Sequence, residues 1–518
     1  MMSDADFPYL SLLTVLPLVG ALVVAAVPRA RPSLARQVAL AWSLVVLGLT
    51  VAMWLAFKPN GPRFQFRESY PWIPTWDARF TFAVDGIGLV MIALVALLVP
   101  LVILYSWNEP HSETGVAPRR SVHAYFALVL ALESTMIGVF AAADIFLFYV
   151  FFEVMLVPMY FLIGSYGGPR RQYAAVKFFL YSLVGGLFML AAVIGLWVLG
   201  GHTFEWEKLL AADFSTGAER WLFLGFFVAF AIKAPFFPFH TWLPDAGGAA
   251  PAGAAALLVG VLDKVGTFGI LRYCLPLFPN ASKYFAPLAL ALALTGIIYA
   301  ALLAVGQNDL KRLVSYTSVA HFGFIGIGIF AFTTQAGSGA VLYMVNHGLA
   351  TGLLFLVVGM FVARRGSALV GDFGGAGRLL PVLSGVFLIA GLATLSLPGT
   401  APFVSEFLVL LGTFTVHKAV AVVGTAGIIL GAAYVLWMVQ RTTQGVPNPE
   451  LSKVRTMRKD LSLRESLVVG PLIILLIFFG FYPKPLLDVI NPAVRATMQD
   501  IGKTDPAPTT AQRTEAGK

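Results

Sequence analysis

Long apolar runs divide almost the whole chain into segments of membrane length. A bilayer core about 30 Å thick is crossed by about 20 helical residues, and runs of this kind recur from Tyr9–Val27 to Leu467–Phe481. We count about fourteen such runs. A chain of 518 residues that is 58% hydrophobic and only 12% charged cannot cover this much apolar surface in water. The sequence therefore predicts an all-α polytopic membrane protein.

Two of the expected spans, the seventh and the twelfth, carry paired prolines. In the seventh, Pro235 and Pro238 lack backbone donors and should release the carbonyls of Ala231 and Ala234 close to Lys233. Irregular backbone at membrane depth persists only against protein or water. We therefore expect both segments to be broken helices that line a site.

The interruptions also predict how the chain is organised. Broken helices five spans apart are typical of inverted repeats with a site near the bilayer midplane. The tail beyond Asn491 is polar, and we expect it to be disordered, while neither 58–80 nor 442–463 resembles a folded extramembrane domain. The predicted parts are helices 1–3 (1–120), a first inverted repeat of helices 4–8 (121–275), a second of helices 9–13 (276–441), and a loop, helix 14 and tail (442–518).

Charge and cysteine content set the topology and exclude some functions. The net charge of +9 comes from basic residues that gather in the loops after odd-numbered spans, as around Arg29, Arg119 and Lys311. Both termini are therefore expected outside, and nucleic acid is not expected as a partner. The only cysteine, Cys274, excludes an internal disulfide or a cysteine-ligated iron–sulfur cluster within the chain.

Ionisable residues inside the expected spans are the strongest functional signal. Each costs about 3 kcal/mol or more to place there, so each needs a reason. Snorkelling or a static ion pair explains a single residue, and we favour that reading for Lys177, Asp144 and Asp263. His240 borders a helix break, and capping the broken helix explains it as well as a role in the site does. The remaining candidates are Glu153, Lys233, Lys264, His321, His347 and Glu406.

Six titratable groups on six spans are harder to explain as packing, because apolar residues would fill the same space without the desolvation cost. Moving a neighbouring charge by a few ångströms lets a buried lysine alternate between holding and releasing a proton. Histidine suits the connecting positions because either ring nitrogen can accept or donate. The set therefore predicts a proton path.

Four stretches carry a family resemblance that covers about residues 80 to 440. They are similar to the signature of the antiporter-like membrane subunits of proton-pumping NADH:quinone oxidoreductase, respiratory complex I. Glu406, in place of the lysine common in other members, resembles the M type, also called chain 4. A departure is Gly247–Ala250, where relatives often carry polar residues. The stretches are Phe151–Met159, Lys233–Asp245, Asn308–His321 and Asn346–Gly348.

The resemblance implies a role for each candidate. Glu153 and Lys233 are expected to form a gating ion pair, Lys264 to be the central proton-binding residue, and Glu406 to act at the outlet. His321 and His347 are expected to connect them, and we add His240 at the helix break.

The resemblance also implies partners and location. We expect neighbouring membrane-arm subunits, other antiporter-like chains among them, in a bacterial inner membrane. FMN, iron–sulfur clusters and quinone are expected in partner subunits and no cofactor in this chain. The alternatives are a subunit of a multi-chain sodium/proton antiporter, a ferredoxin- or hydrogenase-linked relative, and an organic-solute transporter. The last is disfavoured because all the candidate site residues are proton carriers and no cluster that would orient a substrate accompanies them.

Overall fold

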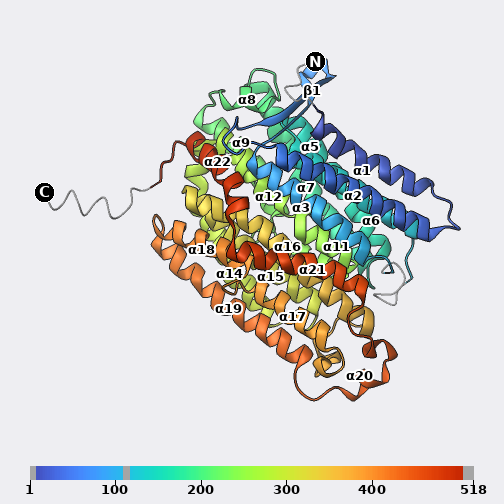
Figure 1. Ribbon diagram of the computed structural model, residues 1–518. Helices are drawn as coiled ribbons and strands as arrows, with labels where there is room; N and C mark the ends of the chain where they lie inside the picture. The colour runs from blue at the N-terminus through green and yellow to red at the C-terminus, as the bar shows by residue number, and fades with distance from the viewer. Residues whose placement is uncertain (1–6, 109–116, 506–518) are drawn as a thin grey trace.

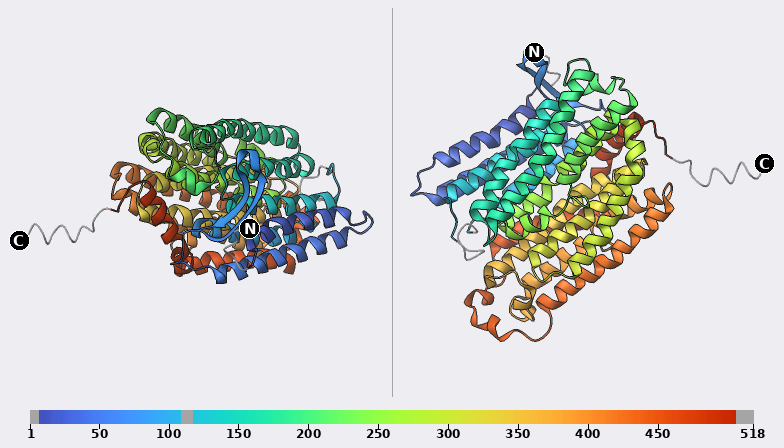
Figure 2. Two further views of the ribbon diagram at one scale, coloured as in Figure 1. Left: turned by 90° about the horizontal axis from the view of Figure 1, so that it is seen from above. Right: turned by 180° about the vertical axis from the view of Figure 1, so that it is seen from behind.

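The computed structural model describes residues 7–108 and 117–505 as a bundle of helices lying side by side, with α1 and α2 along one side and α19 along the opposite side (Figures 1 and 2). Twelve segments of the described chain are long and apolar enough to cross a membrane. They are α1 (Tyr9–Ala26), α2 (Pro32–Ala56), α3 (Gly86–Tyr105), α4 (Val122–Ala141), α5 (Ile145–Val154) with α6 (Leu156–Tyr166), α7 (Arg171–Leu199), the run from α11 to α13 (Ala252–Leu277), α14 (Pro279–Val305), α15 (Leu310–Phe330), α16 (Thr334–Arg365), α19 (Lys418–Thr443) and α21 (Leu463–Phe481).

Two further spans are each built from two shorter helices. The seventh consists of α9 (Thr216–Lys233) and α10 (Trp242–Ala249), and the twelfth of α17 (Pro381–Thr394) and α18 (Ala401–Phe414). Together with the other segments they confirm the predicted polytopic helical fold and place both interruptions where the paired prolines stand. The pairing of the spans as inverted repeats stays a prediction.

The break in the seventh span does not free the backbone as expected. The Ala231 carbonyl, predicted to be released, accepts from the Phe236 amide at 2.9 Å. The Ile232 carbonyl accepts instead from the Trp242 side chain, whose Nε1 donates at 2.8 Å. The prediction was wrong for Ala231 because the amide of Phe236, the residue after Pro235, bonds back to this carbonyl at the end of α9.

The eighth span is helical but irregular. It runs through α11 (Ala252–Leu257), a π-helical turn η3 (Leu258–Leu262), α12 (Lys264–Gly269), a second π turn η4 (Ile270–Cys274) and α13 (Leu275–Leu277). A π turn adds one residue to a helical turn, changes which carbonyls are bonded, and often marks a functional site. Both of these turns lie deep in the bundle, where every residue from Ala252 to Phe278 is buried.

Burial separates a protein-lined core from the outer helices. The segments that span Ala252–Leu277 and α16 are fully buried over their most apolar window, and α15 is 94% buried. The same measure is only 28% for α2 and 22% for α21. Since the outer helices present their apolar side chains outward, the core of α12, α15 and α16 is where ionisable residues find protein neighbours.

The polar stretch after α2 forms a β-hairpin, which its sequence did not predict. Strands β1 (Gln65–Ile73) and β2 (Ala78–Val84) pair antiparallel around η1 (Pro74–Trp76), and Asp77 takes a left-handed conformation (φ 50°). The buried Glu68 of β1 accepts from the amides of Leu10 and Ser11 at 2.9 and 3.1 Å. This carboxylate caps α1, whose N-terminus has no capping side chain of its own.

The expectation of a disordered tail beyond Asn491 is wrong as far as Asp500. Helix α22 (Lys484–Asp500) packs an apolar face, with buried Leu486, Val489 and Ile490 in its first turns, against α16 and α3. This spacing puts the apolar side chains on one stripe and leaves the polar ones outside, which is why the segment reads as polar in sequence. The remaining short helices are α8 (Trp206–Leu210), η5 (Val370–Asp372), η6 (Ala376–Arg378), α20 (Pro449–Lys453) and η7 (Arg455–Arg458).

Candidate proton path

Lys264 is the first residue of α12 and is fully buried. Because η3 is a π turn, the Asp263 amide donates to Leu258 and leaves the Val259 carbonyl free. The Lys264 ammonium donates to that carbonyl and lies 3.1 Å from Asp263 Oδ1 and 2.7 Å from His347 Nδ1. The local irregularity of the helix therefore provides one of the three partners of the central lysine.

Two histidines continue from Lys264. His347 on α16 accepts from the Lys264 ammonium through Nδ1, because a charged lysine can only donate. Its ring lies 5.2 Å from the ring of His321 on α15, nearly perpendicular to it. The Phe322 ring covers this junction, 5.5 Å from the His347 ring and 5.2 Å from Lys264 Nζ. We call Lys264, His347 and His321 the central relay.

Lys233 ends α9 and is also completely buried, but its surroundings are different. Its ammonium has no hydrogen-bond partner among the described residues. It lies instead over the ring of Phe152, at 4.7 Å from the ring centre, and near that of Phe178, at 5.7 Å. Aromatic faces attract a cation, by about 2 kcal/mol when it is desolvated. The quadrupoles of these aromatic rings therefore stabilise the ammonium in place of a carboxylate.

Glu153 lies on α5, and its carboxylate rests against Gly186 of α7. Its Oε1 is buried beside Gly186, at a place where any Cβ would overlap it, and has no hydrogen-bond partner in the described chain. The two charges are near enough to interact electrostatically. Within the described residues they form no direct ion pair, so the gating pair that the resemblance implies stays a prediction.

Glu406 lies in α18, beyond the break of the twelfth span, and is only 4% exposed. Its Oε2 accepts from the Tyr343 hydroxyl at 3.1 Å. Asn346, also on α16, donates to the Ala401 carbonyl at 2.8 Å and ties the start of α18 to the core. The broken helix thus delivers a carboxylate to the same helix that carries His347.

His240 stands apart from the other candidates. It lies between α9 and α10, is 2% exposed, and its ring packs against Phe237 and Tyr299 at 5.9 and 5.4 Å. Its Nδ1 has no hydrogen-bond partner in the part of the chain that is described. The described ring contacts of His240, with Phe237 and Tyr299, include no residue of the central relay.

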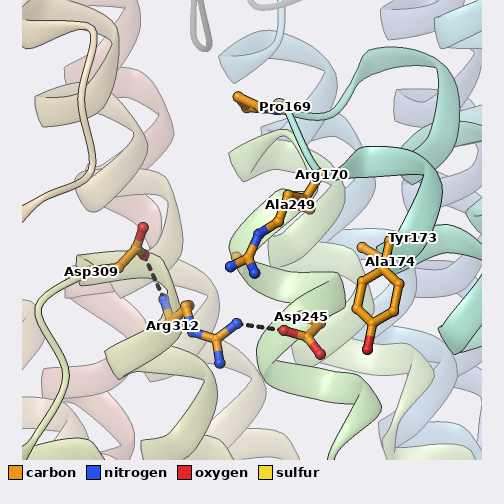
Figure 3. Close-up of a pocket in the computed structure, with 10 residues that line it drawn as sticks. Pro169, Arg170, Tyr173, Ala174, Asp245, Ala249, Asp309 and Arg312 are labelled. Carbon is orange, nitrogen blue, oxygen red and sulfur yellow. Dashed lines mark hydrogen bonds and ion pairs between the residues drawn. The ribbon is translucent and has the colours of Figure 1, made fainter.

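An ionic cluster lies at the α10 end of the seventh span. Asp245 of α10 accepts from Lys177 at 2.7 Å and from Arg312 at 2.5 Å. Figure 3 shows Asp245, Arg312 and Arg170 around one cavity of about 170 Å³, with Asp309 capping the helix that carries Arg312. Lys177 therefore has the structural partner that the sequence favoured for it.

The other two residues interpreted as structural also have local partners. Asp144 caps α5 by accepting from the Leu147 amide at 2.9 Å. Asp263 pairs with Lys264 inside the core.

Two tyrosines next to the path were missed by sequence reasoning: Tyr343, and Tyr434 of α19, whose hydroxyl lies 3.5 Å from His321 Nε2. The available signal was the position of Tyr343 one helical turn before His347.

Comparison with known proteins decides the family. Residues 142–431, which include all seven predicted site residues, match the family model described as NADH:quinone oxidoreductase/Mrp antiporter. The chain belongs to this family. It is 46% identical to NADH-quinone oxidoreductase subunit M of Mycobacterium tuberculosis over 98% of this chain and 97% of that one. It is 40% identical to subunit M of Escherichia coli over 87% and 91% of the two chains.

Two solved structures agree with this fold. A chain of respiratory complex I from Thermus thermophilus superimposes with a TM-score of 0.82 at 31% identity, covering 95% of this chain and all of that one. A chain of the Mrp complex from Dietzia sp. gives 0.84 at 20% identity over 95% and 99% of the two chains. The second likeness concerns the fold alone.

Proposed function

We propose that this chain is the M-type proton-translocating membrane subunit of an NADH:quinone oxidoreductase. The observation that carries the proposal is the central relay, a buried lysine that hydrogen-bonds a histidine with a second histidine beside it, in a chain 46% identical to a subunit M over nearly its whole length. Groups that exchange only protons, held away from lipid, suit a proton carrier better than an organic-solute site.

The geometry suggests how the charges act in sequence. Lys233 holds a proton over aromatic rings, and Glu153 moves toward it or away from it. When Glu153 approaches, the ammonium is stabilised in place; when it withdraws toward Gly186, the proton is more easily lost along the path to Lys264. From Lys264 the proton passes to His347 and His321, and Glu406 receives it at the outlet.

The proposal assigns the redox chemistry to other chains. FMN, iron–sulfur clusters and quinone belong to partner subunits, and their reaction drives this chain through neighbouring membrane-arm subunits. We place it in the inner membrane of a bacterium with both termini outside. We also retain the pairing of 121–275 with 276–441 as inverted repeats, which the two helix breaks support.

The assembly is tested by purification. The tagged chain, extracted from its native membrane in mild detergent, should bring with it NADH:quinone activity and the absorbance of flavin and iron–sulfur clusters. A colourless and inactive multi-chain assembly would overturn the assignment and favour the sodium/proton antiporter.

The proton path is tested by Lys233→Ala. Because Lys233 places a buried charge against Phe152 at the end of α9, its loss should remove most coupled proton pumping and much quinone-reductase turnover while assembly persists. Pumping is measured with a pH-sensitive dye in proteoliposomes. Lys418→Ala, on an exposed lysine at the start of α19, is the matched control. Normal pumping by the Lys233 variant would contradict the role of this residue.

A further inference from the structure

The hydrogen-bonded part of the path stops short of Glu406. His347 Nε2 and His321 Nδ1 have no hydrogen-bond partner among the described residues. Glu406 accepts a hydrogen bond from Tyr343 at 3.1 Å, and no histidine donates to it in the described chain. A proton that has reached the histidines therefore needs one more group before it arrives at the carboxylate.

Tyr343 occupies the intervening position. It lies one turn before His347 on α16 and so shares its face. Its ring centre is 5.8 Å from that of His321 and 6.4 Å from that of His347. Its hydroxyl donates to Glu406 Oε2 at 3.1 Å. One side chain thus contacts the outlet carboxylate and packs beside both histidines.

Of the two histidines beside this step, His321 has the ring closer to Tyr343, at 5.8 Å between ring centres against 6.4 Å for His347. Tyr434 Oη lies 3.5 Å from His321 Nε2, at the outer limit of a hydrogen bond. Nδ1 of the same ring is the nitrogen without a partner. Tyr343 is 1% exposed and Tyr434 is 2% exposed, so both phenols are enclosed by protein. Tyr434 is a positioning residue, because it contacts the histidine but gives the outlet carboxylate no hydrogen bond in the described chain.

We infer that the Tyr343 hydroxyl passes the proton from His321 to Glu406, an inference that rests on the proposed function and names a further carrier within it. A phenol suits the step because its hydroxyl donates and accepts at one atom. The imidazolium N–H bond breaks and its proton joins the phenolic oxygen, while the phenolic O–H bond breaks and its proton joins the carboxylate. Tyrosine is neutral before and after, no electron moves, and rotation of the new hydroxyl resets the carrier.

The experiment compares tyrosine variants in the assembled complex in proteoliposomes, with proton uptake and NADH oxidation measured together. Tyr343→Phe removes one oxygen and keeps the ring, and should lose most coupled pumping, as Glu406→Gln should. Tyr273→Phe is the matched control: this tyrosine is buried in the eighth span and its hydroxyl donates to the Ala142 carbonyl at 3.3 Å, outside the path. It should pump normally, and Tyr434→Phe should lose less than Tyr343→Phe.

A second measurement separates proton transfer from packing and applies even if Tyr343→Phe fails to assemble. Replacing Tyr343 by 3,5-difluorotyrosine keeps the hydroxyl but makes the phenol more acidic. The pH profile of pumping should then move toward lower pH, and the same replacement at Tyr273 should leave it unchanged. An unchanged profile at Tyr343 would overturn the inference.

Failure of this inference and failure of the proposed function are distinguishable. If Lys264→Ala and Glu406→Gln also pump normally, the proton path itself is wrong. If those two lose pumping while Tyr343→Phe retains it, only the carrier role of Tyr343 is wrong, and the proton reaches Glu406 by another group.

Discussion

The two buried lysines are held in opposite ways. Lys264 has three polar partners: a backbone carbonyl, Asp263 and His347. Lys233, equally buried, has none among the described residues and lies against the rings of Phe152 and Phe178. The difference follows from local backbone. A π turn presents a carbonyl to Lys264, whereas the carbonyls at the end of α9 are bonded to Phe236 and Trp242.

This contrast suggests that the two lysines have different roles. A charge with satisfied partners is preorganised and needs only to pass a proton on, which is the role proposed for Lys264 beside His347. A buried charge without partners is costly, and a small movement of Glu153 changes that cost strongly. The Lys233 side of the molecule is therefore suited to respond to a neighbour, and the Lys264 side to conduct.

The largest expected effect tests this contrast through stability. Lys264→Met should destabilise the isolated, detergent-solubilised chain by about 3–5 kcal/mol, because it leaves Asp263 buried without its cation. Lys233→Met should leave the free energy of unfolding unchanged or raise it, because it removes a buried charge that has no hydrogen-bond partner among the described residues. The measurement is equilibrium unfolding in mixed detergent. Equal losses in the two variants would contradict the comparison.

A double variant sharpens the result. Asp263→Leu combined with Lys264→Met removes both charges of the pair and should recover most of the stability lost in Lys264→Met alone. The same Asp263→Leu change combined with Lys233→Met should show no such recovery. If it did, the carboxylate would serve both lysines equally.

A smaller effect is expected where Glu153 rests. Gly186 leaves the space that its carboxylate occupies, so Gly186→Ala should displace the carboxylate from α7. Pumping should fall by about ten-fold, within the range that an ångström-scale misplacement costs, while Lys264 is untouched. Gly48→Ala in α2, where a Cβ would meet nothing, is the control. Unaltered pumping in Gly186→Ala would mean that the position of Glu153 against Gly186 has no part in the cycle.

The elements that the sequence predicted well are those whose signal is local. Apolar length gave the spans, and paired prolines gave the two interruptions, because neither depends on which helices pack together. The hairpin at 65–84 was missed because its stability comes partly from Glu68 capping a distant helix. Helix α22 was missed because half of its surface is polar and its apolar face is satisfied by α16 and α3.

In the candidate site, too, only the features with a local signal could be predicted. The identities of the buried charges could be taken from the sequence, since each is unusual in an apolar span. Their pairing could not. Nothing local shows that the Glu153 carboxylate rests against Gly186, or that Tyr343 of α16 donates to Glu406 of α18. The π turn beside Lys264 likewise depends on packing in a fully buried span.

The smallest expected effect lies outside the membrane, where charges are hydrated. Glu205 pairs with Arg67 at 2.5 Å and with Lys208 at 2.8 Å. Burial raises the pKa of the Glu205 carboxyl, but the bonds to Lys208 and Arg67 outweigh it and hold the pKa below its ordinary value. The folded state therefore gains stability from the ionised carboxylate above the ordinary pKa, and loses it as pH falls through the lowered one.

Glu205→Gln should lower the melting temperature slightly at neutral pH, by the equivalent of less than about 1 kcal/mol for such a partly exposed group. The difference from the unaltered chain should disappear once the pH is well below about 4. Salt should also reduce it, since exposed ion pairs are screened. The Lys264–Asp263 pair differs from the Glu205 pairs chiefly in being closed to water. A loss of stability in Glu205→Gln as large as that in Lys264→Met would therefore show that burial does not set the strength of these ion pairs.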